Sequence, residues 1–275
     1  MGMLAGMRVV IVLVAVVVAG CEGGDGDGDG NAVDGGDGGD DGGDDGGGDG
    51  GGDGGGDGGG GGGELWREEF SNGSGAWPAS WRVLGGVENA TVESGRGRLV
   101  PVLSAYTLAR MGHALPAGTV DVEVTFTLSM AEPGRQGVGL YVRQNGGYLR
   151  DGATHGSGYA VFVEAFRGPQ IGVWRERDGV EESLSRMPVP AIVAGQSYAV
   201  RFRCTQTGAE TTLSARMWPA GAAEPTTWTV TATDATAALQ NTPGDLAVDA
   251  WNTVTPGNGG PPGPIHVDDI VVTAP

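Results

Sequence analysis

The sequence contains no lysine. All sixteen basic residues are arginine, against 34 aspartates and glutamates, and the formal net charge is −18. The acid excess is local, because thirteen acids and no arginine lie in residues 22–63, which leaves 21 acids and 15 arginines beyond residue 63. Recognition of a phosphate backbone needs a basic surface. The composition therefore argues against nucleic acid as a partner.

Long hydrophobic runs and cysteines are also scarce. The longest apolar run, 9–18, follows Arg8 and is too short to cross a hydrocarbon core of about 30 Å. A positive residue, a short apolar run and small residues at its end are typical of a secretory signal. The chain has two cysteines, Cys21 directly after this run and Cys204 far downstream.

The end of the apolar run reads Val18-Ala19-Gly20-Cys21. It resembles the lipobox of bacterial lipoproteins, although Val18 stands where leucine is usual. The resemblance implies that residues 1–20 are a removed signal peptide, that Cys21 is acylated, and that the lipid bilayer is a partner. It places the protein in the cell envelope, and Glu22 favours the outer membrane or cell surface. An ordinary signal peptide with a chance cysteine is the alternative.

Residues 21–63 form a glycine and aspartate tract after the lipidated cysteine. Apart from Ala32 and Val33 it has nothing apolar to bury, so it cannot offset the entropy of ordering. It also lacks the repeated large apolar residue that a folded calcium-binding β-roll needs. We expect a disordered tether with a reach of roughly 35–40 Å.

From residue 64 onward apolar and polar residues alternate with period two, which is typical of strands with one buried face. No window has a convincing helical period, although 233–239 could form one short turn. The pattern predicts one all-β domain over 64–275, folded as a two-sheet antiparallel jelly-roll sandwich of about twelve strands. The clearest expected strands are 120–128, 137–143, 159–166, 171–175, 198–204, 211–218, 227–231, 246–251 and 265–273.

Several short motifs of this domain together resemble concanavalin A-like, laminin G-like domains. The resemblance implies a jelly roll of two curved sheets whose last strand pairs with the first. Its members include carbohydrate-binding modules, glycoside hydrolases and recognition domains, so fold alone does not select a function. The motifs are Leu-Trp-Arg-Glu-Glu-Phe at 65–70, Trp-Pro-Ala-Ser-Trp at 77–81, Gly-Tyr-Ala-Val-Phe at 158–162, Gly-Val-Trp-Arg at 172–175 and Val-Asp-Asp-Ile-Val-Val at 267–272.

Catalytic residues are hard to find in the sequence. Hydrolases of the resembling family carry Glu-x-Asp-x-x-Glu on one strand, and the nearest match here is Asp121 with Glu123, which lacks the third acid. We interpret this pair as the solvent face of an amphipathic strand, and we expect Glu181 at the surface. Cys204 shares the alternating face of apolar neighbours, which predicts a buried, inert thiol.

Candidate ligand and metal residues follow from residue type and from the resemblance. Exposed aromatic rings stack on sugar rings, and the candidates for such contacts are Tyr141, Tyr148, Trp174 and Trp251, with Trp218 also considered. Many sugar-binding jelly rolls hold one structural calcium between the terminal strands. The resemblance implies such a site here, with the hard oxygen ligands Glu68, Glu69, Asp268 and Asp269.

Three hypotheses for function follow. The first is a surface-anchored, non-catalytic recognition module that binds a glycan (a polysaccharide) or another cell-surface component such as a surface protein. The second is a divergent glycoside hydrolase or lyase of the concanavalin A-like fold. The third is a structural lipoprotein of the envelope with no small ligand.

Overall fold

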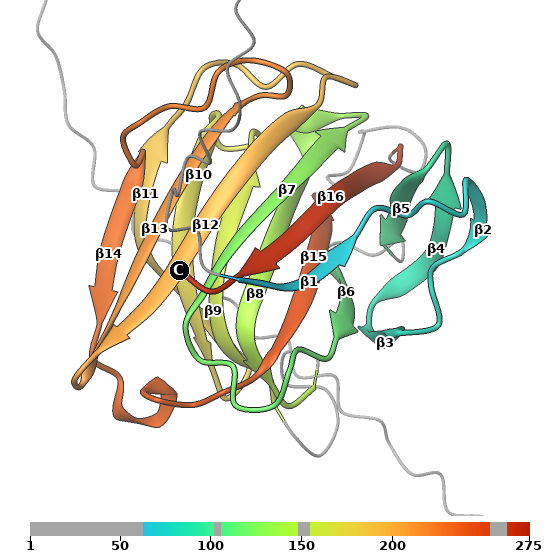
Figure 1. Ribbon diagram of the computed structural model, residues 1–275. Coiled ribbons are helices and arrows are strands. Elements are labelled where there is room, and N and C mark those ends of the chain that lie inside the picture. The colour runs from blue at the N-terminus through green and yellow to red at the C-terminus, as the bar shows by residue number, and fades with distance from the viewer. Residues whose placement is uncertain (1–62, 102–105, 148–154, 254–262) are drawn as a thin grey trace, which may run out of the picture. The chain divides into compact units, whose positions relative to one another are not determined.

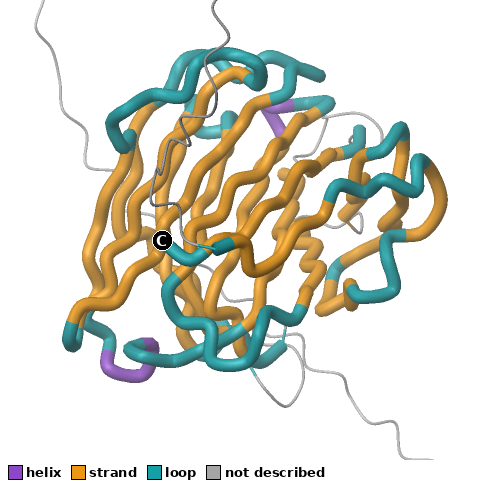
Figure 2. Tube along the Cα trace, viewed as in Figure 1, coloured by secondary structure: helices purple, strands orange, loops and turns teal. Residues whose placement is uncertain are grey.

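The computed structural model describes residues 63–101, 106–147, 155–253 and 263–275. These ranges contain sixteen β-strands and two single-turn 3-10 helices, η1 (Pro133–Arg135) and η2 (Ala237–Leu239). None of the described helices has the length and apolar character needed to cross a membrane. Figure 2 shows that most of the described residues lie in strands. The predicted signal peptide 1–20, Cys21 and the tether up to residue 62 lie outside the described residues.

One sheet, here sheet A, runs in the order β14-β13-β12-β7-β16-β5-β4-β2, and β1 pairs with β16 beside this path. The antiparallel pairing of β1 with β16 joins the two ends of the domain, as the family resemblance implied. The strands of sheet A are β1 (Glu64–Glu68), β2 (Ser74–Ala76), β4 (Val87–Glu93), β5 (Arg96–Pro101), β7 (Val122–Met130), β12 (Tyr198–Thr207), β13 (Glu210–Pro219), β14 (Val230–Asp234) and β16 (Ile265–Thr273).

The other sheet, sheet B, runs in the order β11-β10-β9-β8-β15-β6-β3 and is also antiparallel. It lies behind sheet A in Figure 1. Its strands are β3 (Trp81–Gly85), β6 (Tyr106–His113), β8 (Gln136–Asn145), β9 (Ser157–Glu164), β10 (Gln170–Arg177), β11 (Val180–Pro188) and β15 (Asp245–Thr253).

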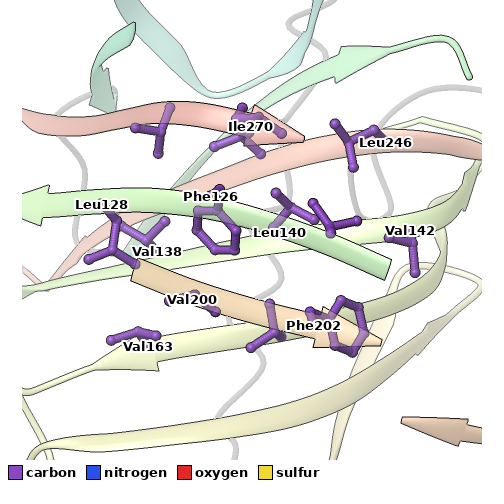
Figure 3. Packing of buried hydrophobic residues seen from close by; sticks show 14 of the residues in the cluster. Phe126, Leu128, Val138, Leu140, Val142, Val163, Val200, Phe202, Leu246 and Ile270 are labelled. Carbon is purple, nitrogen blue, oxygen red and sulfur yellow. The ribbon is translucent and has the colours of Figure 1, made fainter. Parts of the chain in front are cut away.

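The core lies between the two sheets. Alternate residues of each strand point into it, such as Phe126 and Leu128 of β7, Val200 and Phe202 of β12, and Leu140 of β8, as Figure 3 shows. All five are at most 1% exposed. Burying each such side chain contributes about 1.5–3 kcal/mol, which makes this layer the main stabilising element of the fold.

The tryptophan-rich motifs near the start of the domain are packing elements. Phe70 lies 4.9 Å from Trp77 between ring centroids, and Trp77 lies 4.9 Å from Trp81. Phe70 adopts a positive φ of 45° and packs on Gly97, where an added Cβ would lie 2.5 Å from the ring. These residues therefore close one end of the core and are not available to a ligand.

The predicted fold class, an all-β jelly-roll sandwich, is confirmed. Each expected strand has a counterpart within a few residues, and the expected turn at 233–239 contains η2. The prediction missed β2 to β6 and β11. Several of these strands are short or interrupted by register shifts, and β11 is an edge strand with little burial, so their alternation is weak.

Replacing Phe202 with alanine should lower the free energy of unfolding by about 3–5 kcal/mol, because it removes a fully buried ring and leaves a cavity. Urea unfolding followed by tryptophan fluorescence measures the change. Val83→Ala is the matched control, since Val83 is 60% exposed and should change little. Equal effects of the two substitutions would contradict the assigned core.

Candidate functional site

The outer face of sheet B carries the most distinctive group of side chains in the described structure. Since neighbouring residues of a strand face opposite sides, the residues that alternate with the core positions face outward. On the central strands these outward residues are large and aromatic: Tyr141 of β8, Phe162 of β9, Trp174 of β10 and Trp251 of β15. Figure 1 shows these four strands side by side.

Glycines beneath the rings let them lie close to the sheet. An added Cβ at Gly137 would lie 2.1 Å from Trp251, and one at Gly172 would lie 2.3 Å from Phe162. Either side chain would displace the ring above it. The sequence therefore pairs Trp251 and Phe162 each with a glycine on the adjacent strand.

The rings form one continuous aromatic floor. Phe162 and Trp174 are stacked, with centroids 4.6 Å apart and planes at 15°. Trp174 also lies 5.6 Å from Trp251 and 6.0 Å from Tyr141. Tyr141 and Trp251 are buried, whereas Trp174 is half-buried, and its indole Nε1 has no hydrogen-bond partner. Among the rings of this floor, Trp174 is therefore the one that keeps accessible surface for contact with a ligand.

A cleft of about 170 Å³ opens above this floor. It combines aromatic rings with acidic, basic and hydroxyl groups, the composition of sites that fix a polar ligand against an apolar surface. Its described lining residues are Phe162, Glu164, Arg167, Trp174, Glu181, Ser183, Arg186 and Trp251.

A buried charged cluster adjoins the cleft. At its centre is Arg110 of β6, which is fully buried and donates two hydrogen bonds to Asp249, at 2.7 and 2.9 Å. Arg110 also donates to Glu176 at 2.6 Å and lies 3.5 Å from Glu181. Its guanidinium stands over the Tyr141 ring at 4.2 Å.

Three carboxylates thus surround one guanidinium in a largely dry environment, where excess negative charge is costly. Burial raises the pKa of Glu181 to about 7, and it also raises the pKa values of Asp249 and Glu176. The Tyr141 hydroxyl donates a hydrogen bond to Glu181 at 2.7 Å. Since Glu181 also lines the cleft, the cluster brings a carboxyl group that titrates near neutral pH to the ligand surface.

The pKa of the other cleft acid, Glu164, is also raised, which favours its neutral form. Glu164 of β9 is buried at the far end of the cleft and accepts a hydrogen bond from Gln170. Burial raises the pKa of Glu164 despite this hydrogen bond and the nearby charge of Arg167.

Three of the aromatic residues predicted as ligand contacts, Tyr141, Trp174 and Trp251, come together in this floor. Tyr148 lies outside the described residues, and Trp218 lies on β13 of sheet A. Sequence reasoning missed Phe162, Glu164, Arg110 and Asp249, and it expected Glu181 at the surface. The only signal for Phe162 is Gly172, which faces its ring, and that pairing becomes visible only when the strand register is known.

The acids considered for catalysis lie elsewhere. Glu123 forms ion pairs with Arg201 and Arg203 on neighbouring β12 of sheet A. Asp121 accepts a hydrogen bond from the Gln206 amide at 2.8 Å. Asp121 is exposed just before β7, as the solvent-face interpretation expects, but Glu123 is only 7% exposed, so that interpretation is wrong for Glu123, whose carboxylate is held by two arginines. Neither acid lines the cleft. Cys204 is fully buried, and burial raises its pKa to about 12, as the inert-thiol prediction requires.

The predicted calcium ligands are close in the fold but do not form a metal site. Glu68 accepts hydrogen bonds from the Phe70 amide and the Trp81 indole, and Glu69 pairs with Arg67. Burial raises the pKa of Asp268 to about 6, and Asp269 donates its amide to that carboxyl group. No three potential metal ligands gather anywhere in the described ranges. These four acids, as arranged, do not fit a calcium ion.

Comparison with solved structures places the fold among lectins and glucanases. The exoplasmic/lumenal domain of VIP36 in its Ca²⁺-bound form is 13% identical to this chain and superposes with a TM-score of 0.51. The matched region covers 77% of this chain and 90% of the VIP36 chain. The β-glucanase of Bacillus licheniformis is 14% identical, with coverage of 77% and 98% and a TM-score of 0.50. Lectin II from Ulex europaeus is 15% identical, with coverage of 77% and 99% and a TM-score of 0.50.

No protein-family model and no curated protein matches the chain by sequence. At these identities the structural likeness shows the fold alone, a concanavalin A-like jelly roll.

Replacing Glu181 with glutamine should change how stability depends on pH. Because the pKa of Glu181 is about 7 in the folded protein and ordinarily 4.5, the folded state holds a proton that the unfolded state has released between these values. This contribution is full below about pH 4.5 and is lost as the pH rises to 7. The variant stays uncharged, so its melting temperature relative to the unmodified protein should rise steadily from pH 4.5 to 7.5.

Differential scanning fluorimetry across this range measures the effect. Glu88→Gln, at an exposed position on β4, is the control and should follow the unmodified protein at every pH. A pH-independent offset for the Glu181 variant would contradict the assigned proton.

Proposed function

We propose that this protein is a surface-anchored, non-catalytic recognition module that binds a glycan in the cleft over sheet B. The observation that carries the proposal is the half-buried Trp174 ring, stacked on Phe162 and surrounded by acid, hydroxyl and guanidinium groups. A sugar ring has an apolar face and a rim of hydroxyls, so it needs an aromatic surface with polar groups around it.

The polar groups of the cleft suit a polyol. Glu164 and Glu181 can each accept a hydrogen bond, or donate one when protonated, and Ser183 can do both. The unpaired, buried Nε1 of Trp174 is a donor for which the described protein supplies no acceptor. A buried donor without a partner costs free energy, and a ligand oxygen would recover it.

The structural neighbours support a carbohydrate ligand, since one is a plant lectin and another a β-glucanase. Both classes of protein act on sugars, so they leave binding and hydrolysis as alternatives. The arrangement of the carboxyl groups supports binding over hydrolysis.

Hydrolysis by two carboxylates requires a separation of about 5–9.5 Å. In the strand register Glu164 pairs with Gln170 of β10, and Glu181 pairs with Glu176 of the same strand. Six residues along a strand span about 20 Å, and β9 and β11 lie two strand spacings, about 10 Å, apart. The backbones of the two acids therefore lie roughly 20 Å apart, which does not favour their action as a pair.

The remaining acids of this face do not complete a catalytic pair. Asp249 and Glu176 are fully buried and bound to Arg110, and they do not line the cleft. The second candidate, a divergent hydrolase or lyase, is favoured only by Glu181, whose pKa of about 7 suits a general acid. A single such group without a partner supports recognition better than catalysis.

The anchor belongs to the same proposal. The lipobox-like Val18-Ala19-Gly20-Cys21 supports acylation of Cys21, and the glycine and aspartate tract up to residue 63 supports a flexible spacer. Such a spacer would let the cleft reach a polymer beyond the outer membrane or cell surface. A structural envelope lipoprotein would need the anchor but not the cleft.

Replacing Trp174 with alanine should abolish glycan binding, because it removes the stacking surface and the free indole donor. Screening the full-length protein on a glycan array, followed by calorimetry with the best ligand, measures the loss. Trp218→Ala is the matched control, since Trp218 is a half-buried tryptophan on sheet A. Absence of binding to any glycan by the unmodified protein would refute the proposed function.

Replacing Cys21 with serine should release the protein from the membrane fraction and abolish incorporation of a labelled fatty acid, because serine provides no thiol for diacylglycerol. Growth with an alkyne-tagged palmitate, followed by cell fractionation, measures both effects. Cys204→Ser leaves Cys21 intact and should retain the label. Labelling that survives loss of Cys21 would contradict the lipoprotein assignment.

A further inference from the structure

Arginines in this domain are almost always paired with an acid. In the described ranges every arginine except Arg96, Arg167 and Arg186 has a carboxylate oxygen within 4.0 Å. Acids outnumber arginines beyond residue 63, so carboxylates are not scarce. An arginine without one is therefore an exception whose location is informative.

Two of the three exceptions share the cleft. Arg167 lies in the turn between β9 and β10, with its guanidinium over the Phe166 ring at 4.9 Å. Arg186 lies on β11 opposite Gly172, the glycine on which Phe162 rests. Both arginines are exposed, and both line the cleft beside the aromatic floor. They supply two unpaired guanidinium groups at one end of it.

The cleft does not end at these arginines. A second hollow of about 360 Å³ is also lined by Arg167 and Arg186, and it continues along Pro169, Met187 and Pro188. The two hollows therefore share both arginines, and we refer to the two together as the groove, which extends from the aromatic floor to β11 at the edge of sheet B. A groove open at its end suits a chain rather than a single sugar.

We propose that this groove binds an acidic polysaccharide, in which carboxylate or sulfate groups on the sugar rings pair with Arg167 and Arg186 while a ring stacks on Trp174. This inference rests on the proposed function and specifies its ligand. A guanidinium binds a carboxylate or sulfate through two parallel hydrogen bonds, which gives both strength and direction. A neutral polysaccharide would give the two guanidinium groups no anionic partner beyond the nearby Glu164.

The acids of the cleft modulate this preference. Glu164 and Glu181 face the ligand surface, and the groups packed against Glu181 are Arg110 of β6, Tyr141 of β8, Glu176 of β10 and Asp249 of β15. Since the pKa of Glu181 is about 7, the groove loses negative charge below neutral pH. Binding of an anionic chain should therefore strengthen from pH 8 to pH 6.

The test compares matched polysaccharides with the purified full-length protein. Polygalacturonate and its fully methyl-esterified form share a backbone and differ in the carboxylate, and dextran sulfate and dextran differ in the sulfate. The double variant Arg167→Gln/Arg186→Gln should weaken binding of the preferred acidic chain about tenfold or more. Arg96→Gln is the matched control, because among the described residues Arg96 also has no carboxylate oxygen within 4.0 Å, donates only to the Ser129 hydroxyl, and lies on β5 of sheet A.

We expect the protein to bind the carboxylated or the sulfated chain more tightly than its neutral partner. This preference should be lost in the double variant and kept in Arg96→Gln. The pair of polysaccharides that shows the preference identifies the anionic group. Equal binding of neutral and acidic chains, or unchanged binding by the double variant, would overturn this inference and leave the proposed function standing. Equal binding of polyglutamate would also overturn it, since no sugar would be required. Failure to bind any of the polysaccharides would count against both proposals.

Discussion

The middle of sheet B is buried on both faces, and the rest of the structure depends on this constraint. Every residue of β9 after Ser157 is buried, and β8 and β15 are nearly as enclosed. One face of these strands meets the core, and the other lies under aromatic rings and the Arg110 cluster. On the outer face of such a sheet, large rings, small residues and charges must fit together as closely as the side chains of a core do.

The charged cluster follows from the same enclosure. Arg110 is fully buried, so it needs carboxylate partners, and it has more of them than one guanidinium neutralises. Burial and the neighbouring charge of Asp249 raise the pKa of Glu181 to about 7, so this member of the cluster, which reaches the cleft, binds a proton near neutral pH. Burial of a structural ion pair thereby determines the protonation state of a group on the ligand surface.

The sequence predicted the sandwich because strands such as β7, β12, β13 and β16 have one apolar and one polar face. Residue type named Tyr141, Trp174 and Trp251 as candidate sugar contacts, and alternation added only that either Val173 or Trp174 leaves the main core. The sequence could not assemble the site, because Glu164, Glu176, Glu181 and Asp249 come from four strands whose neighbours and register are fixed only by the folded sheet. Glu181 was misjudged for a related reason, since its environment comes from Arg110, 71 positions earlier in the chain.

The charges of this face fall into two groups with different physical roles. Where a guanidinium is enclosed, as with Arg110, the fold surrounds it with acids, because an unpaired buried charge would be destabilising. At Arg167 and Arg186 the exposed guanidinium has no carboxylate of the described residues within 4.0 Å, although other exposed arginines of sheet B, such as Arg82 and Arg177, do have one. An exposed, unpaired charge adds little stability, but it steers a partner of opposite sign and sets its orientation. The aromatic floor between the two groups supplies a surface that any sugar can stack on, so selection among sugars must come from the charged rim.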